Sequence, residues 1–375
     1  MSQHTFSSFA FGIISICLLT ATSVQGQETT LRGTLMDRES RSPIPYASLT
    51  PLGQSERGVL SNVDGVFSLT WENNTSDTLI IRHLNYGQVR IGGGTELSDT
   101  IWLQPVPIEL GEVAIFSGPP QYLWTQVLEH LDQNHYHQKV TYSADSRSMF
   151  YSPNRQELYY LSQSKADLYC RKEKRFPKVD RVKMTRQTLS EIGERLEAGR
   201  SRVMHEVPAA SFFKVFSPAF KKSAVKEFDI EIKRSFVQNG KEIAEVYLVS
   251  QESEAGRRGV FLIDLETYGI LSAKYEFPGK SGNACWYQLA FTEINGKYYM
   301  TYIDHRYTSD AFMDQVYFHH IIASLKVLER TPSEDAISFL KLCFEPFSDY
   351  AITWDDPSWE SGAFIPWPNW VTEKL

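Results

Sequence analysis

Apolar and polar residues alternate over much of this chain, and the alternation predicts a protein built mainly of β-strands. In VFSLTW at 66–71, Phe, Leu and Trp take every second position, which places them on one face of a strand. Turn signals such as NVDG at 62–65 separate these runs, because glycine tolerates a positive φ. Short strands between frequent turns are typical of a small β-sandwich, which we expect over residues 28–105.

Helical spacing is clear in SGPPQYLWTQVLEHLDQNHY at 117–136. Prolines precede or open its first turn, where a missing N–H is tolerated, and the following apolar residues recur at helical spacing: Leu123, Val127, Leu128 and Leu131. From Phe228 onward the alternation returns, with hairpin turns at Asn239-Gly240, Thr267–Gly269 and Asn295-Gly296. We expect residues 119–345 to form a helix and a larger antiparallel β-meander, half-barrel-like and with few helices, after a linker at 106–118.

The stretch 346–375 contains four Trp and four Pro, so it cannot form one regular element. Exposing several Trp side chains to water costs a few kcal/mol, roughly estimated from their apolar area. We therefore expect an extended tail that packs across the sheet and buries its tryptophans: Trp354, Trp359, Trp367 and Trp370.

The first residues are apolar over 9–19 and include no Asp, Glu, Lys or Arg before Glu28, a pattern that predicts a secretory signal peptide over 1–26, cleaved after Gly26. An uncleaved anchor is the alternative, but the apolar core is shorter than the ~20 residues of a spanning helix. The large residue before Cys17 argues against lipidation there. We expect an exported protein, periplasmic or outer-membrane-associated, and peripheral to a membrane at most.

The net charge of −7 argues against a nucleic-acid partner. The basic run 170–187 is either a solvated face or a site for an anionic lipid or polyanion.

Three cysteines follow the leader: Cys170, Cys285 and Cys343. No two of them have metal-ligand spacing, and export would permit one disulfide, whereas three isolated thiols is the alternative.

No segment has the spacing of a catalytic or metal site. The chain lacks Gly-x-Ser-x-Gly and His-Glu-x-x-His, and GKSG at 279–282 lacks the upstream glycine spacing of a phosphate loop. Adjacent strand residues point to opposite faces, which separates two candidate pairs: Asp304–His305 and His319–His320. His135 and His137 would share a face, but zinc needs three or four ligands, and Asp355-Asp356 is most simply a turn. We expect no catalytic residue, no metal and no cofactor.

The N-terminal segments RGTLMD, SPIPYASLTPLG, GVLSNVDGVFSLTW and DTLIIRHLNYG resemble the carboxypeptidase-regulatory-like domain, a prealbumin-type sandwich of seven strands. The shared positions are Gly33, Asp37, Pro45, Ala47, Asn62, Asp64, Gly65, Phe67, Tyr86 and Gly87. The resemblance covers roughly residues 28–116. It implies a short cell-envelope protein of Bacteroidota in which this domain is an accessory module without peptidase chemistry.

Within the shared turn, Asp64 is open to two interpretations. A Ca²⁺ site needs six to eight oxygen ligands, and this turn offers one carboxylate. The other interpretation is a hydrogen-bond acceptor in an Asx-turn.

Three functions remain open at this stage. The first is a non-enzymatic envelope protein that binds a lipid, a glycan or a protein partner. The second is an outer-membrane assembly or docking factor that acts by protein contacts only, and the third is an uncharacterised hydrolase. A lipid carrier should have an apolar cavity in the meander domain, a docking factor an exposed apolar patch, and a hydrolase a nucleophile in contact with a base.

Overall fold

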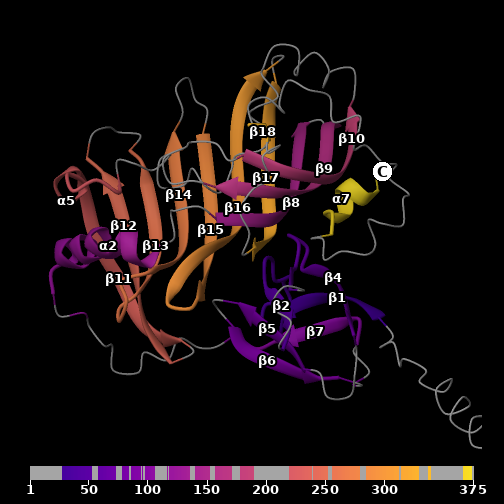
Figure 1. Cartoon of the computed structure of the whole chain (residues 1–375), viewed down its shortest axis with the longest axis horizontal. Helices are drawn as coiled ribbons and strands as arrows, with labels where there is room; N and C mark the ends of the chain where they lie inside the picture. The colour runs from indigo at the N-terminus through magenta and orange to yellow at the C-terminus, as the bar shows by residue number, and fades with distance from the viewer. Residues whose placement is uncertain are drawn as a thin grey trace, which may run out of the picture.

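The computed structural model describes the following residues: 28–52, 58–72, 78–83, 86–93, 95, 98–105, 116, 118–135, 140–152, 157–170, 178–189, 219–238, 240–251, 256–278, 284–311, 314–328, 337–338 and 366–373. Within this part of the chain the strands form three sheets, and helices are few (Figure 1). The mainly β fold expected from the alternating pattern is confirmed.

The N-terminal sandwich contains seven of the described strands: β1 (Glu28–Asp37), β2 (Ser48–Pro51), β3 (Val59–Leu60), β4 (Val66–Glu72), β5 (Thr78–His83), β6 (Tyr86–Gly92) and β7 (Thr100–Leu103). One sheet has the order β4-β1-β7 and the other β3-β2-β5-β6. β1 pairs antiparallel with β4 but parallel with β7. Side chains from both sheets form one apolar core: Leu35, Ile44, Ala47, Leu49, Val59, Phe67, Leu69, Leu79, Ile81, Ile101 and Leu103.

Two positions that carry the family resemblance contact each other in this sandwich. The Tyr86 hydroxyl donates to Oδ2 of Asp37 at 2.6 Å, and Oδ1 of Asp37 accepts from the backbone N–H groups of Glu39 and Ser40. These hydrogen bonds, with that of Tyr86 the strongest influence, lower the pKa of Asp37. The pair therefore links β1 to β6, which belong to different sheets.

The Asn62–Gly65 turn has the geometry that its sequence predicts, with φ of 73° at Gly65. A Cβ at this position would collide with the carbonyl oxygen of Leu35, so only glycine fits. Oδ1 of Asn62 accepts from the backbone N–H groups of Asp64 at 2.9 Å and Val66 at 2.8 Å. The Asx-turn acceptor is thus Asn62 and not Asp64.

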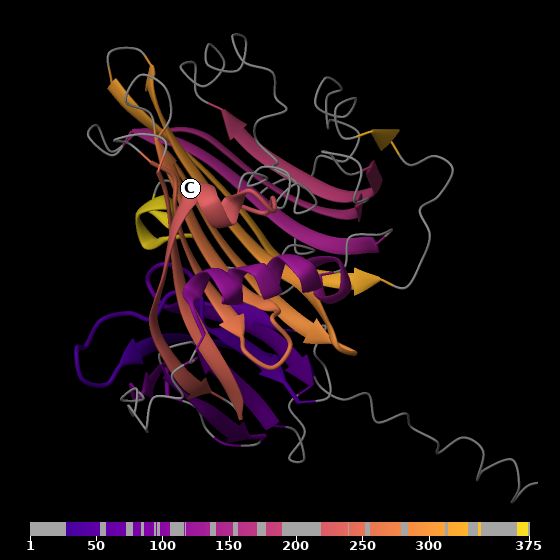
Figure 2. The same ribbon diagram turned by 90° about the vertical axis from the view of Figure 1, so that its left-hand side faces the viewer.

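The large sheet contains eleven described strands: β8 (Val140–Ser152), β9 (Glu157–Cys170), β10 (Lys178–Leu189), β11 (Phe228–Gln238), β12 (Lys241–Ser250), β13 (Arg258–Asp264), β14 (Ile270–Pro278), β15 (Ala284–Ile294), β16 (Lys297–Ala311), β17 (Asp314–Leu328) and β18 (Ile337–Ser338). Consecutive strands from β11 to β17 pair antiparallel, as the meander prediction requires. β8–β10 then join the sheet through the β17–β8 pair. Figures 1 and 2 show the sheet curving, so that β8–β10 are turned relative to β11–β16.

Three hairpin turns of the meander lie where the sequence predicts them. Asn295 and Gly296 both have positive φ, of 53° and 74°, as a type I′ turn requires. Gly240 has φ of 78°, but in the Thr267–Gly269 turn the residue with positive φ, of 61°, is Tyr268 and not the glycine. The local sequence therefore sets where these strands reverse.

Helix α2 (Pro120–Asn134) crosses β11–β16 on one face of the large sheet, called the inner face below (Figure 2). Leu123, Trp124 and Val127 are buried, whereas Leu128 and Leu131 are only partly buried, so the predicted apolar stripe is shifted. The Trp124 ring lies 4.9 Å from that of Phe261. Its Nε1–H donates to the carbonyl oxygen of Ala219 at 3.0 Å, just before the short helix α5 (Ala224–Glu227).

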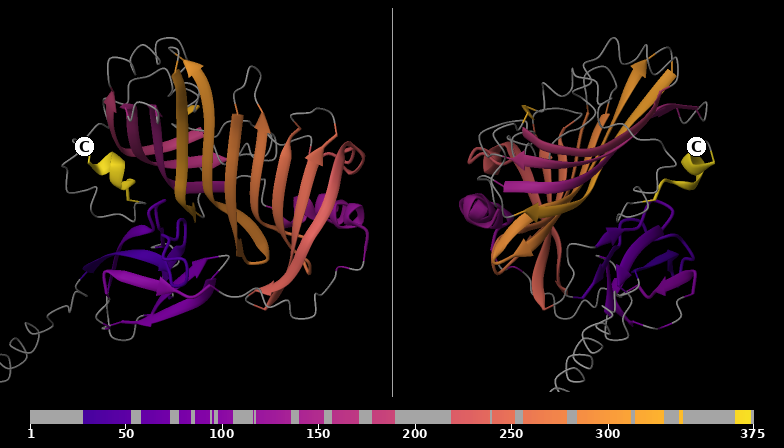
Figure 3. Two further views of the ribbon diagram at one scale, coloured as in Figure 1. Left: turned by 180° about the vertical axis from the view of Figure 1, so that it is seen from behind. Right: turned by 45° about the vertical axis from the view of Figure 1, so that its right-hand side comes forward.

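The described end of the chain, residues 366–373, is called the strap and includes α7 (Asn369–Thr372). It lies between the sandwich and β8–β10, on the face opposite α2, called the outer face (Figure 3). Val371 of the strap packs on the sheet, but Trp367 and Trp370 are only partly buried there. Residues Asn369–Thr372 form a helix where an extended tail was expected. Trp354 and Trp359 lie outside the described residues.

Several segments discussed above also fall outside the described residues: the leader 1–26, most of the linker 106–118, residues 171–177 of the basic run, GKSG at 279–282, His137, Cys343 and Asp355-Asp356. For β10, β17 and β18, and for Cys170, the structure describes the backbone only. Of the helices that it does describe, none combines the length and apolar character needed to cross a bilayer.

Candidate functional site

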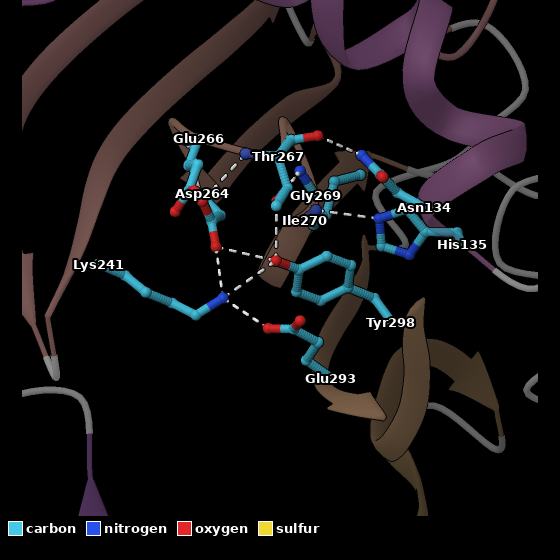
Figure 4. A network of polar contacts seen from close by, with 10 residues as sticks. All are labelled: Asn134, His135, Lys241, Asp264, Glu266, Thr267, Gly269, Ile270, Glu293 and Tyr298. Atoms are coloured by element: carbon cyan, nitrogen blue, oxygen red, sulfur yellow. Dashed lines mark hydrogen bonds and ion pairs between the residues drawn. The ribbon is translucent and has the colours of Figure 1, made fainter. Parts of the chain in front are cut away.

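A buried carboxylate, Asp264, is the centre of the polar network where α2 meets the sheet (Figure 4). Its side chain is 0% exposed. Oδ2 accepts from Nζ of Lys241 at 2.6 Å and from the hydroxyl of Tyr298 at 2.9 Å. Oδ1 accepts from the backbone N–H groups of Glu266 and Thr267 at 3.0 and 3.2 Å. Both oxygens are therefore satisfied by four donors.

The network stabilises its own charges. Burial alone would raise the pKa of Asp264, but hydrogen bonds from Lys241 and Tyr298 outweigh it, so the pKa of this carboxyl is lowered. Burial likewise disfavours the Lys241 ammonium, whereas its bonds to Asp264 and Glu293 raise its pKa. Asp264 and Lys241 consequently remain an ion pair at neutral pH, and Asp264 is not poised as a general base.

The same network holds the C-terminal end of α2. Nδ2 of Asn134 donates to the carbonyl oxygen of Thr267 at 2.5 Å, and Nε2 of His135 accepts from the backbone N–H of Ile270 at 2.9 Å (Figure 4). The His135 ring also contacts the rings of Phe291 and Tyr298, at 4.9 and 5.5 Å. His135 thus joins the helix to the sheet and is a structural residue.

A row of polar residues crosses the inner face of the sheet from strand to strand. Successive cross-strand partners are Tyr287 on β15, His305 on β16, His320 on β17, Ser148 on β8 and Ser162 on β9. The His305 ring stacks on Tyr287 at 4.1 Å, and its Nε2 lies 3.6 Å from Sγ of Cys285. In the next row, the hydroxyls of Ser146 and Ser164 are 2.6 Å apart.

Cys285 and His305 are residue types that form nucleophile–base pairs, but here the thiol is not activated as a nucleophile. Burial raises the pKa of the Cys285 thiol to about 12, so it is un-ionised at neutral pH. Cys285 is a free cysteine, which excludes it from any disulfide in this structure. The side chains of Cys170 and Cys343 lie outside the described residues, so the choice between one disulfide and isolated thiols is not tested for these two.

Asp304 and His305 point to opposite faces of β16, as predicted from their adjacency. On the outer face, Oδ2 of Asp304 accepts from Nη2 of Arg306 at 2.6 Å and Oδ1 from its Nε at 3.0 Å. Nη2 of Arg306 also donates to the hydroxyl of Tyr46 in the sandwich at 2.9 Å, and the Tyr46 ring lies 5.4 Å from that of Tyr302. This cluster therefore joins the two domains, and Asp304 is not available for acid–base catalysis.

The strap provides a second connection between the domains. Nδ2 of Asn62 donates to the carbonyl oxygen of Trp367 at 2.9 Å, and Oδ2 of Asp64 accepts from the backbone N–H of Asn369 at 2.8 Å. On the sheet side, Nη1 of Arg147 donates to the carbonyl oxygen of Pro366 at 3.0 Å, and its guanidinium lies 3.8 Å from the Trp367 ring centre. Asp64 thus binds the strap in this structure.

The strap also packs an apolar side chain on the sheet. Val371 is buried against Met149 and Leu161, and the Trp370 ring lies 5.2 Å from that of Tyr151. Trp367 and Trp370 were expected to be buried on the sheet and are partly buried, whereas the contact of the strap with the Asn62–Gly65 turn was not expected. No local signal could have shown it, because 305 residues separate Asn62 from Trp367.

Among the described residues, no group of three or more His, Cys, Asp or Glu side chains is arranged to hold a metal ion. Asp264 in the sheet and His135 at the end of α2 instead bind neighbouring side-chain and backbone groups.

The chain matches no protein-family model and no curated protein. It is similar to solved structures at low identity. A DUF1329 family protein from Desulfovibrio piger is 11% identical with a TM-score of 0.28, covering 57% of this chain and 95% of that protein. A domain of a proposed outer membrane lipoprotein-sorting protein from Vibrio parahaemolyticus is 10% identical with a TM-score of 0.28, covering 60% and 98%. A LolA superfamily protein from Nitrosomonas europaea is 12% identical with a TM-score of 0.23, covering 58% and 96%.

Proposed function

We propose that this protein is a non-enzymatic binding protein of the cell envelope, and that it holds a lipid against the inner face of β8 and β9. The observation that carries the proposal is the set of small side chains on this part of the sheet. They are defined here as the serine patch: Ala144, Ser146, Ser148, Ser162, Ser164 and Ala166.

The two halves of the inner face differ in how they are filled. Over β11–β16, α2 places Trp124 against Phe261 and closes the space above the sheet. Over β8 and β9, no helix of the described chain lies on the inner face, and the side chains are small. Layers packed on a sheet stand about 10 Å away, and side chains as small as Ser and Ala span little of that distance. Ala144, Ser148 and Ser164 are 3%, 2% and 9% exposed, so a ligand on this patch would be enclosed and would not lie on open surface.

The chemistry of this surface fits an amphipathic ligand. Phe150 and Tyr160 lie at one end of the serine patch, with ring centres 4.9 Å apart, and Ala144 and Ala166 lie at the other. An acyl chain would pack on these apolar groups. The hydroxyl of Ser162, between them, would bond to the polar head group, because a hydroxyl both donates and accepts.

The charged and nucleophilic groups support a role without catalysis. Asp264 is bound by Lys241, Asp304 is bound by Arg306 on the outer face, and the Cys285 thiol is un-ionised. Asp264 and Asp304 thus each connect separate elements of the fold. The predicted leader and accessory sandwich are in keeping with a protein of the cell envelope.

The test is direct measurement of a bound lipid. The full chain would be purified from a periplasmic fraction, and its bound lipids would be identified by mass spectrometry after solvent extraction. Affinity for a pyrene-labelled phospholipid would then be measured with the Ser162→Trp variant, which fills the patch, and with Thr292→Trp as the matched control. Thr292 is exposed at the far hairpin of β15 and β16.

We expect Ser162→Trp to weaken probe binding by about ten-fold or more, the factor that corresponds to about 1.4 kcal/mol, and Thr292→Trp to bind like the parent. Thermal unfolding of each variant would establish that it is folded. A parent protein that carries no lipid and does not bind the probe would refute the proposal, as would a folded Ser162→Trp variant with unchanged affinity.

A further inference from the structure

The bond that joins His135 to the sheet depends on the protonation of its imidazole. Nε2 of His135 accepts from the backbone N–H of Ile270 at 2.9 Å, so this nitrogen carries no proton and the ring is neutral. A second ring proton would place two N–H donors against each other. His135 is 1% exposed, so water cannot come between them. The bond therefore forms only while Nε2 is unprotonated.

Asn134 and His135 attach the C-terminal end of α2 to the turn between β13 and β14. Beside the bond to Ile270, Nδ2 of Asn134 donates to the carbonyl oxygen of Thr267 at 2.5 Å (Figure 4). These two bonds, called the latch, involve Asn134, His135, Thr267 and Ile270. His135 also forms a parallel bridge with Tyr298 at the start of β16. Ile270, at the start of β14, is 0% exposed, so the latch closes the inner face at this point.

Trp124 attaches the first half of α2 by contacts that do not change with pH. Its ring lies 4.9 Å from that of Phe261, and its Nε1–H donates to the carbonyl oxygen of Ala219 at 3.0 Å. Neither contact includes a group that gains or loses a proton near neutral pH. Loss of the latch would therefore free only the C-terminal end of the helix, while its first turns stay on the sheet.

The charged groups of the sheet beside the latch lie beyond the Tyr298 ring, which is 5.5 Å from that of His135. The Tyr298 hydroxyl lies 2.9 Å from the Asp264 carboxylate and 3.3 Å from the Lys241 ammonium. This ammonium also binds Glu293 at 2.6 Å. At neutral pH the two carboxylates and the ammonium sum to one negative charge. They attract an imidazolium at His135, but they leave the backbone N–H donor in front of it.

The other ionisable side chains of α2 and the turn form no bond of the latch. Three of them are exposed: Glu129, Asp132 and Glu266. The half-buried His130 ring lies 5.1 Å from that of Tyr268, and its Nδ1 donates to the carbonyl oxygen of Gln126 at 2.9 Å. Protonation of this ring leaves that bond intact, because Nδ1 is already the donor. Two more ionisable residues follow in the sequence, outside the described residues: His137 and Lys139.

We propose that His135 is a pH-sensitive latch residue, and that protonation of its imidazole frees the C-terminal end of α2 and uncovers the inner face beneath it. An imidazole in water binds its proton at about pH 6.5, whereas the latched ring cannot bind one at Nε2. The ratio of released to latched molecules therefore rises as the pH falls, by about 25-fold between pH 7 and pH 5. The proposal concerns how α2 is held and is independent of a lipid on the serine patch.

The experiment is amide hydrogen exchange on the full chain at about pH 7 and about pH 5, corrected for the effect of pH on exchange from an unfolded chain. Mass spectrometry compares the latch amides, in peptides over residues 129–136 and 266–274, with the amides of β12. We expect the latch amides to exchange about 25-fold faster at pH 5 than at pH 7, and faster than those of β12 at both. Histidines of the sandwich such as His83 lie in a domain with its own core, so their titration is not read by these amides.

The test variant is His135→Gln. Its side-chain oxygen takes the place of Nε2 as the acceptor for the Ile270 N–H and does not titrate, so the latch amides should be equally protected at both pH values. The matched control is His130→Gln, which removes an imidazole of the same helix and leaves both bonds of the latch. It should keep the pH dependence of the parent. Thermal unfolding at pH 7 would establish that both variants are folded.

Three outcomes would overturn the proposal. One is a parent whose latch amides exchange equally at both pH values, or no faster than those of β12, since α2 would then leave only when the sheet unfolds. Another is an unchanged pH dependence in folded His135→Gln. The third applies even where that variant does not fold: imidazole nitrogen chemical shifts of the parent that show a protonated Nε2 at pH 7 would exclude His135 as the acceptor.

Discussion

The sandwich and the large sheet differ in the buried polar and charged side chains of their cores. The sandwich core is apolar, and its buried polar groups are few: the Ser61 hydroxyl donates to the carbonyl oxygen of Ile44, and Asp37 accepts from Tyr86. The large sheet buries more charges, and Asp264 and Asp304 each connect elements distant in the sequence. Apolar packing thus dominates the sandwich, whereas the large sheet depends more on polar contacts, and the two should respond differently to mutation.

The largest expected effect is that of Asp264→Ala. Removing this carboxylate leaves Lys241, Tyr298 and two backbone N–H groups without their acceptor, so we expect the free energy of unfolding to fall by about 4 kcal/mol. Urea denaturation followed by tryptophan fluorescence would measure it. Glu293→Gln, which weakens only the exposed bond to Lys241, is the matched control and should cost less than about 1 kcal/mol. Equal losses would show that the buried network has no special role.

A somewhat smaller loss is expected for Leu69→Ala in the sandwich. Leu69 is completely buried, and the cavity should lower the free energy of unfolding of this domain by about 3 kcal/mol. Calorimetry should show the loss in one transition only, because the sandwich has its own core. A uniform downward shift of the whole unfolding profile would instead mean that the two domains unfold as one unit.

Trp367→Ala tests how the two domains are connected. The substitution removes the ring under the Arg147 guanidinium, and we expect a loss of about 1–2 kcal/mol. Hydrogen exchange should accelerate at the Asn62–Gly65 turn, while the cores of both domains stay protected. Glu373→Ala, at an exposed position of the same strap, is the control. Unchanged exchange in the turn would argue that the Tyr46–Arg306 contact alone fixes the sandwich.

The smallest effect concerns pH. Burial, assisted by the nearby Lys274 ammonium, lowers the pKa of His83 to about 4. Because the unfolded imidazole binds its proton near pH 6.5, stability should fall as the pH drops from about 6.5 toward 4. In the parent, this loss should lower Tm by a few degrees between pH 7 and pH 5. The His83→Gln variant should lack this pH-dependent fall in Tm. Asp264 affects stability at lower pH. Because folding lowers its pKa, its contribution to the free energy of unfolding is lost only as the pH falls below about 4. An identical slope in parent and variant would contradict the assignment to His83.

Features set by neighbouring residues were predictable from the sequence. Asn295-Gly296 and Gly65 adopt the positive φ angles that their turns need, and the prolines before α2 mark where the helix begins. These features depend on backbone sterics within a few residues. The strands of the meander were predictable for the same reason, since alternation over a few residues already distinguishes two faces.

Contacts between distant segments were not predictable. Nothing near Asp264 in the sequence indicates that Lys241 and Tyr298 will converge on it, and nothing near Val140 indicates that β8 will pair with β17. Trp124 is buried on α2, whereas Leu128 is only partly buried. Trp124 bonds to the carbonyl oxygen of Ala219 and packs on Phe261, contacts that depend on tertiary structure.

The serine patch has a recognisable pattern in the sequence. Ser146 and Ser148 alternate on one strand, and Ser162 and Ser164 on the next, which predicts four hydroxyls on one face of a hairpin. The sequence could not show that this face is the inner one, or that His305 lies in the same row, because that requires the β16–β17–β8 register.

The strap has a consequence for the timing of folding. A ribosome that has just made the Asn62–Gly65 turn must add about 300 more residues before the Trp367 carbonyl that binds Asn62 exists. The sandwich can form its own core as soon as it emerges from the ribosome. Its contact with the strap, however, can form only after residues 366–373 have been synthesised. The final orientation of the first domain is therefore among the latest events in the maturation of the molecule.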